Sequence, residues 1–239
     1  MQVKTYKITI FILILFSNTR ILTNSIKTHE IKNQNNYNAK IEQNKLYIEK
    51  IYQDVSGFGI SGKESKFISD KGGNSTYGEI TYESVENLIK SLKLDKKSVF
   101  YDLGCGVGKA VLQVYLNSSV KKSVGVELSK TRIEKAKTLK KQLKLDKKLA
   151  ENRKLKFFEE NMTKISLKDA TAIYMCSTCF SDELMSDMTN KMGKECKKGL
   201  KVATLRTLPA HDAFKKIDEL KLPMTWSNSS SVYIYEKIA

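Results

Sequence analysis

The chain has 239 residues, of which 41% are hydrophobic and only 2 are proline, so it can bury the core of one domain and excludes long proline-rich linkers. Its 42 Lys and Arg residues outnumber 26 Asp and Glu, which gives a formal net charge of +16. Such an excess favours polyanionic partners (nucleic acid, nucleosome-like assemblies or an anionic membrane), and a lysine-rich surface that is merely solvated is the alternative.

The first 26 residues form a segment of their own. Lys4 and Lys7 precede an apolar run over residues 8–16, which is too short to span a bilayer but suits the hydrophobic region of a secretory signal peptide. No Ala-x-Ala-like cleavage site follows and Arg20 intrudes, so a short membrane anchor or a core strand stays open. We expect no other stable membrane contact, a polar and partly helical lead-in over residues 27–70, and one domain over residues 71–239.

A glycine-rich turn follows the first clear strand. Residues 98–104 are typical of a buried strand and residues 109–116 of a helix, and Asp102 is followed by three glycines at every second position, Gly104, Gly106 and Gly108. Glycines permit positive φ and close approach of backbone N–H groups to a ligand, and the new helix offers unpaired donors. Dinucleotide enzymes use Gly-x-Gly-x-x-Gly instead. This spacing resembles motif I of the class I S-adenosylmethionine-dependent methyltransferases, although the glycines alone also suit an ordinary tight turn.

A second acid supports a nucleotide site. The run from Lys122 to Glu127 reads as the next buried strand, and Glu127 stands 25 residues after Asp102, which is one strand–helix–strand unit. An acid at the end of that strand is placed to accept hydrogen bonds from ribose hydroxyls. Residues 121–156 also hold 14 Lys or Arg against 4 acids, an electrostatic footprint for a polyanion, although any single lysine on a helix face is more simply a solvated one.

The rest of the chain alternates between helix and strand patterns. We predict a helix over 130–149, strands over 155–160 and 172–177, a helix over 182–197, a strand over 199–205, a helix over 211–220, and a hairpin of residues 223–227 and 231–238 turning at 228–231. This order predicts an α/β fold with a doubly wound, mostly parallel, seven-stranded Rossmann-like sheet and a C-terminal antiparallel hairpin. Asp102, Glu127, Asn161 and Ser177 would share its carboxyl edge, where such sheets bind ligands.

The cysteines do not predict a metal site. Cys176 and Cys179 form a lone Cys-x-x-Cys pair and the chain has only 2 histidines, whereas a zinc site needs four ligands. The pair ends a predicted strand instead of opening a helix, so a redox role is not expected.

Two further motifs indicate a family. Thr76-Tyr77-Gly78-Glu79-Ile80-Thr81 precedes a predicted helix over 82–92, and the glycine turn continues as Gly106-Val-Gly-Lys-Ala-Val-Leu-Gln113. With Val124-Gly-Val-Glu127, these segments resemble the disruptor-of-telomeric-silencing family, the histone lysine methyltransferases with a class I fold and not a SET domain. The resemblance covers about residues 75–238 and implies S-adenosylmethionine as cofactor, no metal, and a protein lysine as acceptor, with a histone or nucleosome as partner.

The resemblance assigns cofactor contacts residue by residue. Tyr77 and Glu79 would cover the methionine half of the cofactor, Asp102 and the turn glycines its amino-acid end, and Glu127 its ribose. Lys109 stands where the family has glutamine and can still pair with the cofactor carboxylate. Near the adenine, Asn161 and Met162 replace an acid and an aromatic, and asparagine can still accept a hydrogen bond from the exocyclic amine.

The acceptor side departs further from the family. Trp226 and Tyr233 resemble the residues that line its lysine channel, but the family's Asn-Asn-Phe after strand four reads Cys176-Ser177-Thr178, with Phe180 two residues later. An aromatic channel beside Ser177 would desolvate a lysine, lower its pKa and hold a methylated ammonium. Trp226 and Phe180 as plain core aromatics remain the alternative.

The altered segment leaves the acceptor open. A small molecule or a non-histone protein is the first alternative, and a non-catalytic module that binds S-adenosylmethionine is the second. The cofactor is an intracellular metabolite, so we expect action in a nucleus or cytoplasm, that of a host if the first segment is an export signal.

Overall fold

The computed structural model describes residue 32 and residues 34–239. The chain divides into two compact units, Met1–Lys45 and Leu46–Ala239. Residues 34–45 of the first unit are helical, and the predicted signal-like or anchor segment over residues 1–26 lies outside the described residues. None of the helices in the described part of the chain is long and apolar enough to cross a membrane.

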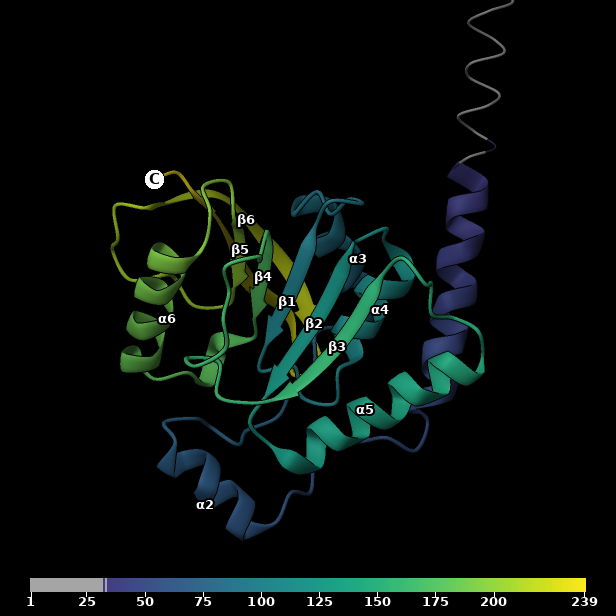
Figure 1. The fold of residues 1–239 in the computed structure, drawn as a ribbon, viewed down its shortest axis with the longest axis horizontal. Helices are drawn as coiled ribbons and strands as arrows, with labels where there is room; N and C mark the ends of the chain where they lie inside the picture. Colours follow the sequence, from purple (N-terminus) through teal and green to yellow (C-terminus); the bar gives the residue numbers. More distant parts are fainter. Residues whose placement is uncertain (1–31, 33) are drawn as a thin grey trace, which may run out of the picture. The chain divides into compact units, whose positions relative to one another are not determined.

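The second unit is built on one seven-stranded sheet with the order β3-β2-β1-β4-β5-β7-β6 (Figure 1). Its parallel strands are β1 (Val99–Leu103), β2 (Lys122–Glu127), β3 (Lys154–Glu159), β4 (Ala172–Met175) and β5 (Lys201–Thr204). An antiparallel pair closes the sheet, β6 (Phe214–Met224) and β7 (Ser227–Lys237). The predicted doubly wound, mostly parallel sheet with a C-terminal antiparallel hairpin is confirmed.

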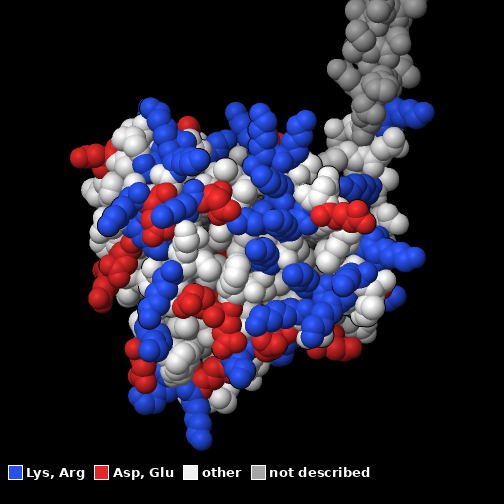
Figure 2. All heavy atoms as spheres, viewed as in Figure 1, with Lys and Arg blue, Asp and Glu red and all other residues white. Residues whose placement is uncertain are grey.

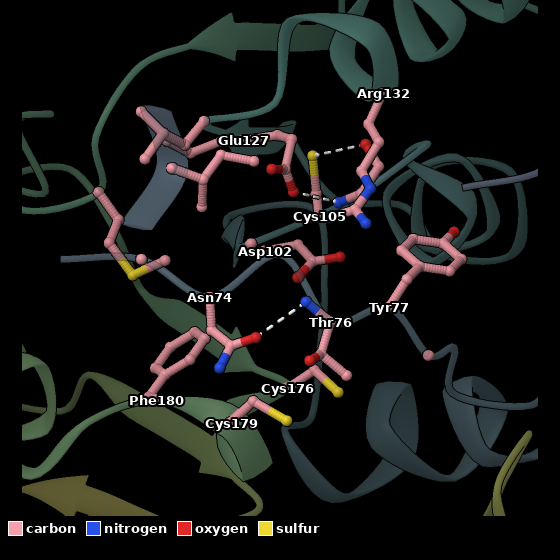
Figure 3. A pocket seen from close by; sticks show the side chains of 18 of the residues that line it. Asn74, Thr76, Tyr77, Asp102, Cys105, Glu127, Arg132, Cys176, Cys179 and Phe180 are labelled. Atoms are coloured by element: carbon pink, nitrogen blue, oxygen red, sulfur yellow. Dashed lines mark hydrogen bonds between the residues drawn. The ribbon is translucent and has the colours of Figure 1, made fainter. Parts of the chain in front are cut away.

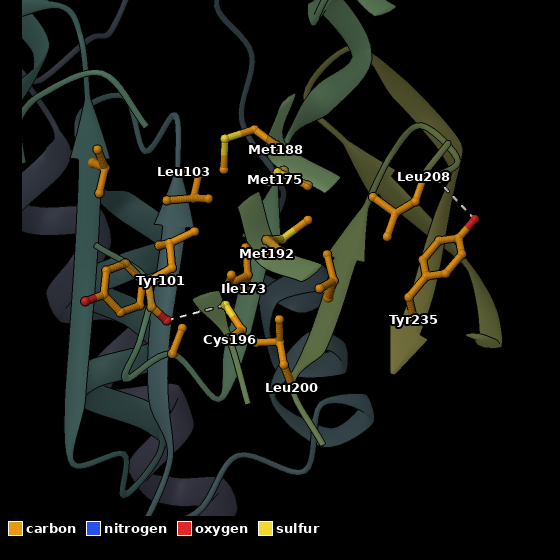
Figure 4. Close-up of a cluster of buried hydrophobic side chains, with 14 of the residues drawn as sticks. Tyr101, Leu103, Ile173, Met175, Met188, Met192, Cys196, Leu200, Leu208 and Tyr235 are labelled. Carbon is orange, nitrogen blue, oxygen red and sulfur yellow. Dashed lines mark hydrogen bonds between the residues drawn. The ribbon is translucent and has the colours of Figure 1, made fainter. Parts of the chain in front are cut away.

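Helices cover both faces of this sheet. In Figure 1, α6 (Asp182–Glu195) lies on one side, and α3 (Tyr82–Ser91), α4 (Lys109–Asn117) and α5 (Lys130–Leu145) lie on the other. The two-residue period of β1 serves both layers, because Tyr101 and Leu103 pack in the cluster that holds Met188 and Met192 of α6 (Figure 4), whereas Phe100 packs with α3 and α4. All five residues of β1 are buried, as expected for a central parallel strand.

The helix starts follow from local chemistry. Thr81 caps α3 and Ser129 caps α5, each accepting a backbone N–H three residues on. A short helix, α2 (Gly62–Asp70), is capped in the same way by Ser61. In contrast, α4 begins at Gly108 with φ of 81° and no side-chain cap among the described residues. The chain therefore passes from β1 into α4 through glycine backbone alone.

The C-terminal region corrects three predictions. The predicted helix over residues 211–220 is wrong, because residues 214–224 form β6, and pairing with β7 decides for strand in a segment whose charged and apolar spacing also suits a helix. The predicted turn at residues 228–231 is wrong as well, since the strands are joined at Thr225 and Trp226. The helix predicted to reach residue 149 ends at Leu145. Exposed charges along β6 are typical of an edge strand.

Candidate functional site

A cavity of about 290 Å³ lies at the carboxyl ends of β1, β2 and β4, where β1 and β4 lead away in opposite directions through the sheet. Figure 3 shows its wall from close by. Most of the predicted site residues line it, namely Tyr77, Glu79, Asp102, Gly104, Gly106, Lys109, Glu127, Asn161, Met162, Phe180 and Trp226. The structure therefore brings together residues that lie up to about 150 positions apart in the chain.

The glycine turn forms the floor of the cavity. Gly106 has φ of 54°, and a Cβ on it would lie 2.6 Å from Cε2 of Tyr77. Gly108 has φ of 81°, and a Cβ there would lie 2.6 Å from the Phe157 ring, so this glycine allows α4 to pack close to the sheet without lining the cavity itself. Side chains at these two positions would clash and would strain the backbone.

Asp102 is a buried carboxylate that lacks a counter-ion. Only 3% of the residue is exposed, and Oδ1 has no hydrogen-bond partner among the described residues. Burial, and to a lesser extent the nearby charge of Glu127, raises the pKa of Asp102 to about 8. A buried acid in this state is stabilised by a cationic ligand, because the ligand charge replaces the lost hydration of the carboxylate.

Glu127 is held rigidly beside it. Oε2 accepts the N–H of Gly106 at 2.8 Å, and Oε1 accepts the N–H of Ser129 at 2.8 Å. The carboxylate thus ties the β1–α4 turn to the start of α5. Each oxygen keeps a second lone pair, so the group can still accept hydrogen bonds from hydroxyls of a ligand.

Residues 71–79, which we call the cover segment, close the cavity on one side. The Tyr77 hydroxyl donates to Glu79 Oε1 at 2.6 Å, and Lys109 Nζ lies 3.1 Å from Glu79 Oε2. Backbone hydrogen bonds of Glu79 with Thr225 join the segment to the β6–β7 turn. Burial and the Glu79 carboxylate raise the pKa of Tyr77, which therefore stays a neutral donor.

The turn after β3 supplies another part of the wall. Asn161 lines the cavity, but its Oδ1 already accepts from the N–H and the hydroxyl of Thr163, both at 2.9 Å. Glu160 lines the same region and was missed by the sequence interpretation, although an acid directly after a predicted strand was a usable signal. Glu160 is thus a further acceptor for an exocyclic amine at this end.

The opposite wall is apolar and carries two thiols. Phe180 and Trp226 line it, and 44% of Trp226 is exposed, so this indole lies at the mouth of the cavity. Cys176 and Cys179 point toward the cavity on either side of a single 3₁₀ turn (Figure 3). Burial raises the pKa of Cys176 to about 12, which keeps it as a thiol and makes it a poor nucleophile.

Two predicted catalytic residues do not reach this wall. Ser177 is fully buried, bonds Thr204 Oγ1 at 2.7 Å and accepts the N–H of Arg206 at 2.8 Å, so its hydroxyl faces β5. Tyr233 packs on the α6 side of the sheet, because its neighbours Val232 and Ile234 belong to the cluster on the other face. Neither residue lines the cavity.

Arg132 is a cavity residue that sequence reasoning did not identify. Its guanidinium lies 4.8 Å from the centre of the Tyr77 ring, and the residue is 4% exposed. Nε donates to the Gly57 carbonyl at 2.9 Å and Nη2 to the Ser75 carbonyl at 2.7 Å. No sequence signal predicts these contacts, because both acceptors are backbone atoms more than 50 residues away.

A model of the family described as "Histone methylation protein DOT1" matches residues 64–237, which is more than half of the chain. The chain belongs to this DOT1 family. The resemblance to the disruptor-of-telomeric-silencing methyltransferases is thereby confirmed, and the sheet order is that of their class I fold.

Individual relatives of this DOT1-family chain are distant. It is 27% identical over 142 residues to a histone-lysine N-methyltransferase, H3 lysine-79 specific, from Caenorhabditis elegans, covering 56% of this chain and 15% of that protein. It is also 27% identical over 120 residues to a protein-lysine N-methyltransferase from Saccharolobus islandicus, covering 50% of this chain and 69% of that one. Among solved structures, an RNA methyltransferase from Salinibacter ruber in complex with S-adenosyl-L-homocysteine aligns with a TM-score of 0.48 at 17% identity, over 65% of this chain and 91% of that one.

Proposed function

We propose that this DOT1-family chain is an S-adenosylmethionine-dependent methyltransferase that acts on a lysine side chain of a protein. The observation that carries the proposal is Asp102, a buried carboxylate with an unpartnered oxygen directly before the glycine turn. The site occurs in a class I fold and in a chain of the DOT1 family.

The residues fit this cofactor at both ends. Asp102 would hold its ammonium, and binding would release the carboxyl proton that a pKa of about 8 retains at neutral pH. Glu127 would accept from the ribose hydroxyls, and Lys109 would lie near the carboxylate. When bound, S-adenosylmethionine supplies a methyl group on a sulfonium, so the protein has mainly to align an acceptor and exclude water.

The cavity also suits a neutral amine as acceptor. The mouth is lined by Trp226 and Phe180, and the thiol of Cys176 is uncharged. A lysine that enters past these side chains loses hydration, which lowers its pKa and favours the free amine. Aromatic faces also attract a methylated ammonium.

A protein acceptor, with a histone as the first candidate, is supported by the printed names of two relatives, a histone-lysine and a protein-lysine methyltransferase. The chain spans about 15% of the length of the Caenorhabditis elegans relative, so partners of that whole protein are proposals for this one. Thiols of Cys176 and Cys179 beside the cavity favour a small molecule or a non-histone protein as the second candidate, because the family's Asn-Asn-Phe segment is replaced there.

Isothermal titration of S-adenosylmethionine into the full chain tests the cofactor, with Asp102→Asn as the matched variant that keeps side-chain volume. We expect micromolar binding in the native protein and at least ~100-fold weaker binding in the variant, since a buried charge pair contributes about 3 kcal/mol or more. Circular dichroism of both proteins controls for folding.

Transfer of a tritiated methyl group to nucleosomes, free histones, other basic proteins and small amines then tests the acceptor. Methyl-lysine in a protein product supports the proposal, and transfer only to small amines contradicts its acceptor while keeping the cofactor. Folded protein that does not bind S-adenosylmethionine would overturn both enzyme readings and leave a non-catalytic module.

A further inference from the structure

A second recess lies at the opposite edge of the sheet, where the parallel strands begin. It has a volume of about 570 Å³ and is lined by eight lysines, Lys97, Lys121, Lys122, Lys154, Lys156, Lys168, Lys197 and Lys198. We call these residues the lysine row. Figure 2 shows Lys and Arg gathered in the upper part of the view, on the side where the strands of Figure 1 begin.

The sheet explains why these lysines form a row. In the order β3-β2-β1-β4-β5, each strand is preceded by or begins with at least one of them. Backbone hydrogen bonds fix the starts side by side, with Lys154 N–H on the Lys121 carbonyl at 3.0 Å and Lys121 N–H on the Ser98 carbonyl at 2.9 Å. Neighbouring strands lie about 4.8 Å apart, so five strand starts span about 19 Å.

The charge of the row is hardly neutralised from within. Asp169 is the only acid that lines the recess, and it is already engaged by Lys122 and by the hydroxyl of Tyr101 at 2.8 Å. Within the described part of the chain, the other seven lysines make no ion pair. All seven are exposed. Seven like charges around one recess repel each other, and a polyanion that binds there relieves this repulsion.

The lining indicates which polyanion fits. Flexible ammonium groups suit phosphates as point charges, and none of the residues lining the recess in the described chain has an aromatic ring on which an unpaired base could stack. Phosphates follow one strand of a duplex every 3.4 Å, so a row of about 19 Å runs past about six of them. We propose that the lysine row binds the sugar–phosphate backbone of a nucleic-acid duplex.

The position of the row adds a functional consequence. Parallel strands of four to six residues separate it from the cofactor cavity, which is about 13–20 Å of sheet. A duplex on the row would therefore leave the cavity accessible. The proposal is independent of the proposed enzymatic function, because binding requires neither cofactor nor acceptor.

The test is fluorescence anisotropy of the full chain with a labelled 20-base-pair DNA duplex between 50 and 200 mM salt. The test variant replaces Lys121, Lys154, Lys168 and Lys198 by Gln. The control variant makes the same charge change elsewhere, at the exposed residues Lys130, Lys141, Lys144 and Lys215. We expect the test variant to lose at least ~10-fold in affinity and its salt slope to fall by about 3–4, or ~0.9 for each phosphate contact.

Equal losses in the two variants would overturn the proposal, since net charge alone would then explain binding. Tighter binding to phosphatidylserine vesicles or to polyglutamate than to the duplex would overturn it too. Four Lys→Arg changes at the test positions should retain binding, which controls for folding. An RNA duplex of the same length is compared with the DNA, and binding of either supports the proposal and identifies the source. Titration of S-adenosylmethionine should be unchanged in the test variant.

Discussion

Arg132 offers a sharp test of how the cavity is closed, and we expect Arg132→Lys to weaken cofactor binding. Arg132 joins the carbonyls of Gly57 and Ser75 and lies against the Tyr77 ring between them. A Cβ on Gly57 would lie 2.0 Å from the Tyr77 ring, so this ring packs directly on the backbone that Arg132 holds. The guanidinium therefore fixes the cover segment onto α5.

The expected magnitude follows from the contacts that lysine loses. An ammonium can reach one of the two carbonyls, so one hydrogen bond to a charged group is lost, worth about 1.5–3 kcal/mol. Part of the cation–π contact is lost as well, worth about 0.5–2 kcal/mol. Because some of this is recovered by relaxation, we expect S-adenosylmethionine to bind ~10- to 100-fold more weakly.

Titration calorimetry and hydrogen exchange of residues 71–79 would measure the effect. The matched control is Lys135→Met, which removes one exposed hydrogen bond from the same helix to the Ser56 carbonyl and should change affinity less than ~3-fold. Faster exchange in the cover segment with little change in melting temperature is expected, since closure is a local event. Native affinity in a folded Arg132→Lys protein would refute the reasoning.

Three further predictions concern the carboxylate, the turn and the lysine beside it. Asp102→Asn should raise the melting temperature of the ligand-free protein: the folded pKa of about 8 lies above the ordinary 3.8, so the native protein loses stability as pH rises from 4 to 8, by up to ~1.4 kcal/mol per pH unit, and thermal melts at pH 5 and pH 8.5 should show the gap widening. Gly106→Ala should reduce cofactor affinity more than ~10-fold by titration, because alanine is strained at φ of 54° and its Cβ meets Tyr77. Lys109→Gln should change affinity less than ~5-fold, because its ion pair with Glu79 is partly exposed; a larger loss would mean that Lys109 contacts the cofactor directly.

The sequence predicted those parts of the site that depend on neighbours in the chain. Asp102, the turn glycines and Glu127 follow from two short strand patterns, and the parallel sheet places both strand ends at one edge. The same reasoning failed for residues 214–224, where the local pattern suits a helix and pairing with β7 determines the strand. Local signals thus located the cofactor side more completely than the C-terminal wall.

The side to which a strand residue points was the second limit. Tyr233 was predicted to line the acceptor channel, but the alternation along β7 turns it toward α6, and Trp226 reaches the cavity from the turn instead. Ser177 was placed correctly at the end of β4, yet its hydroxyl bonds β5. A one-residue change in register reverses the face of every side chain, and sequence pattern alone did not fix it in this segment.

Long-range contacts were the third limit, and they connect the two edges of the sheet. Arg132 acts on carbonyls far away in the chain, and the lysine row joins residues from the starts of five strands. Sequence counting concentrated the basic charge in residues 121–156, whereas the fold assigns part of that charge to the exposed side of α5 and part to the row. Parallel strands bring the acids at their carboxyl ends together at one edge and the lysines at their amino ends at the other. One sheet thereby separates a site for a small cationic cofactor from a surface suited to a polyanion, so that the two can be changed and measured independently.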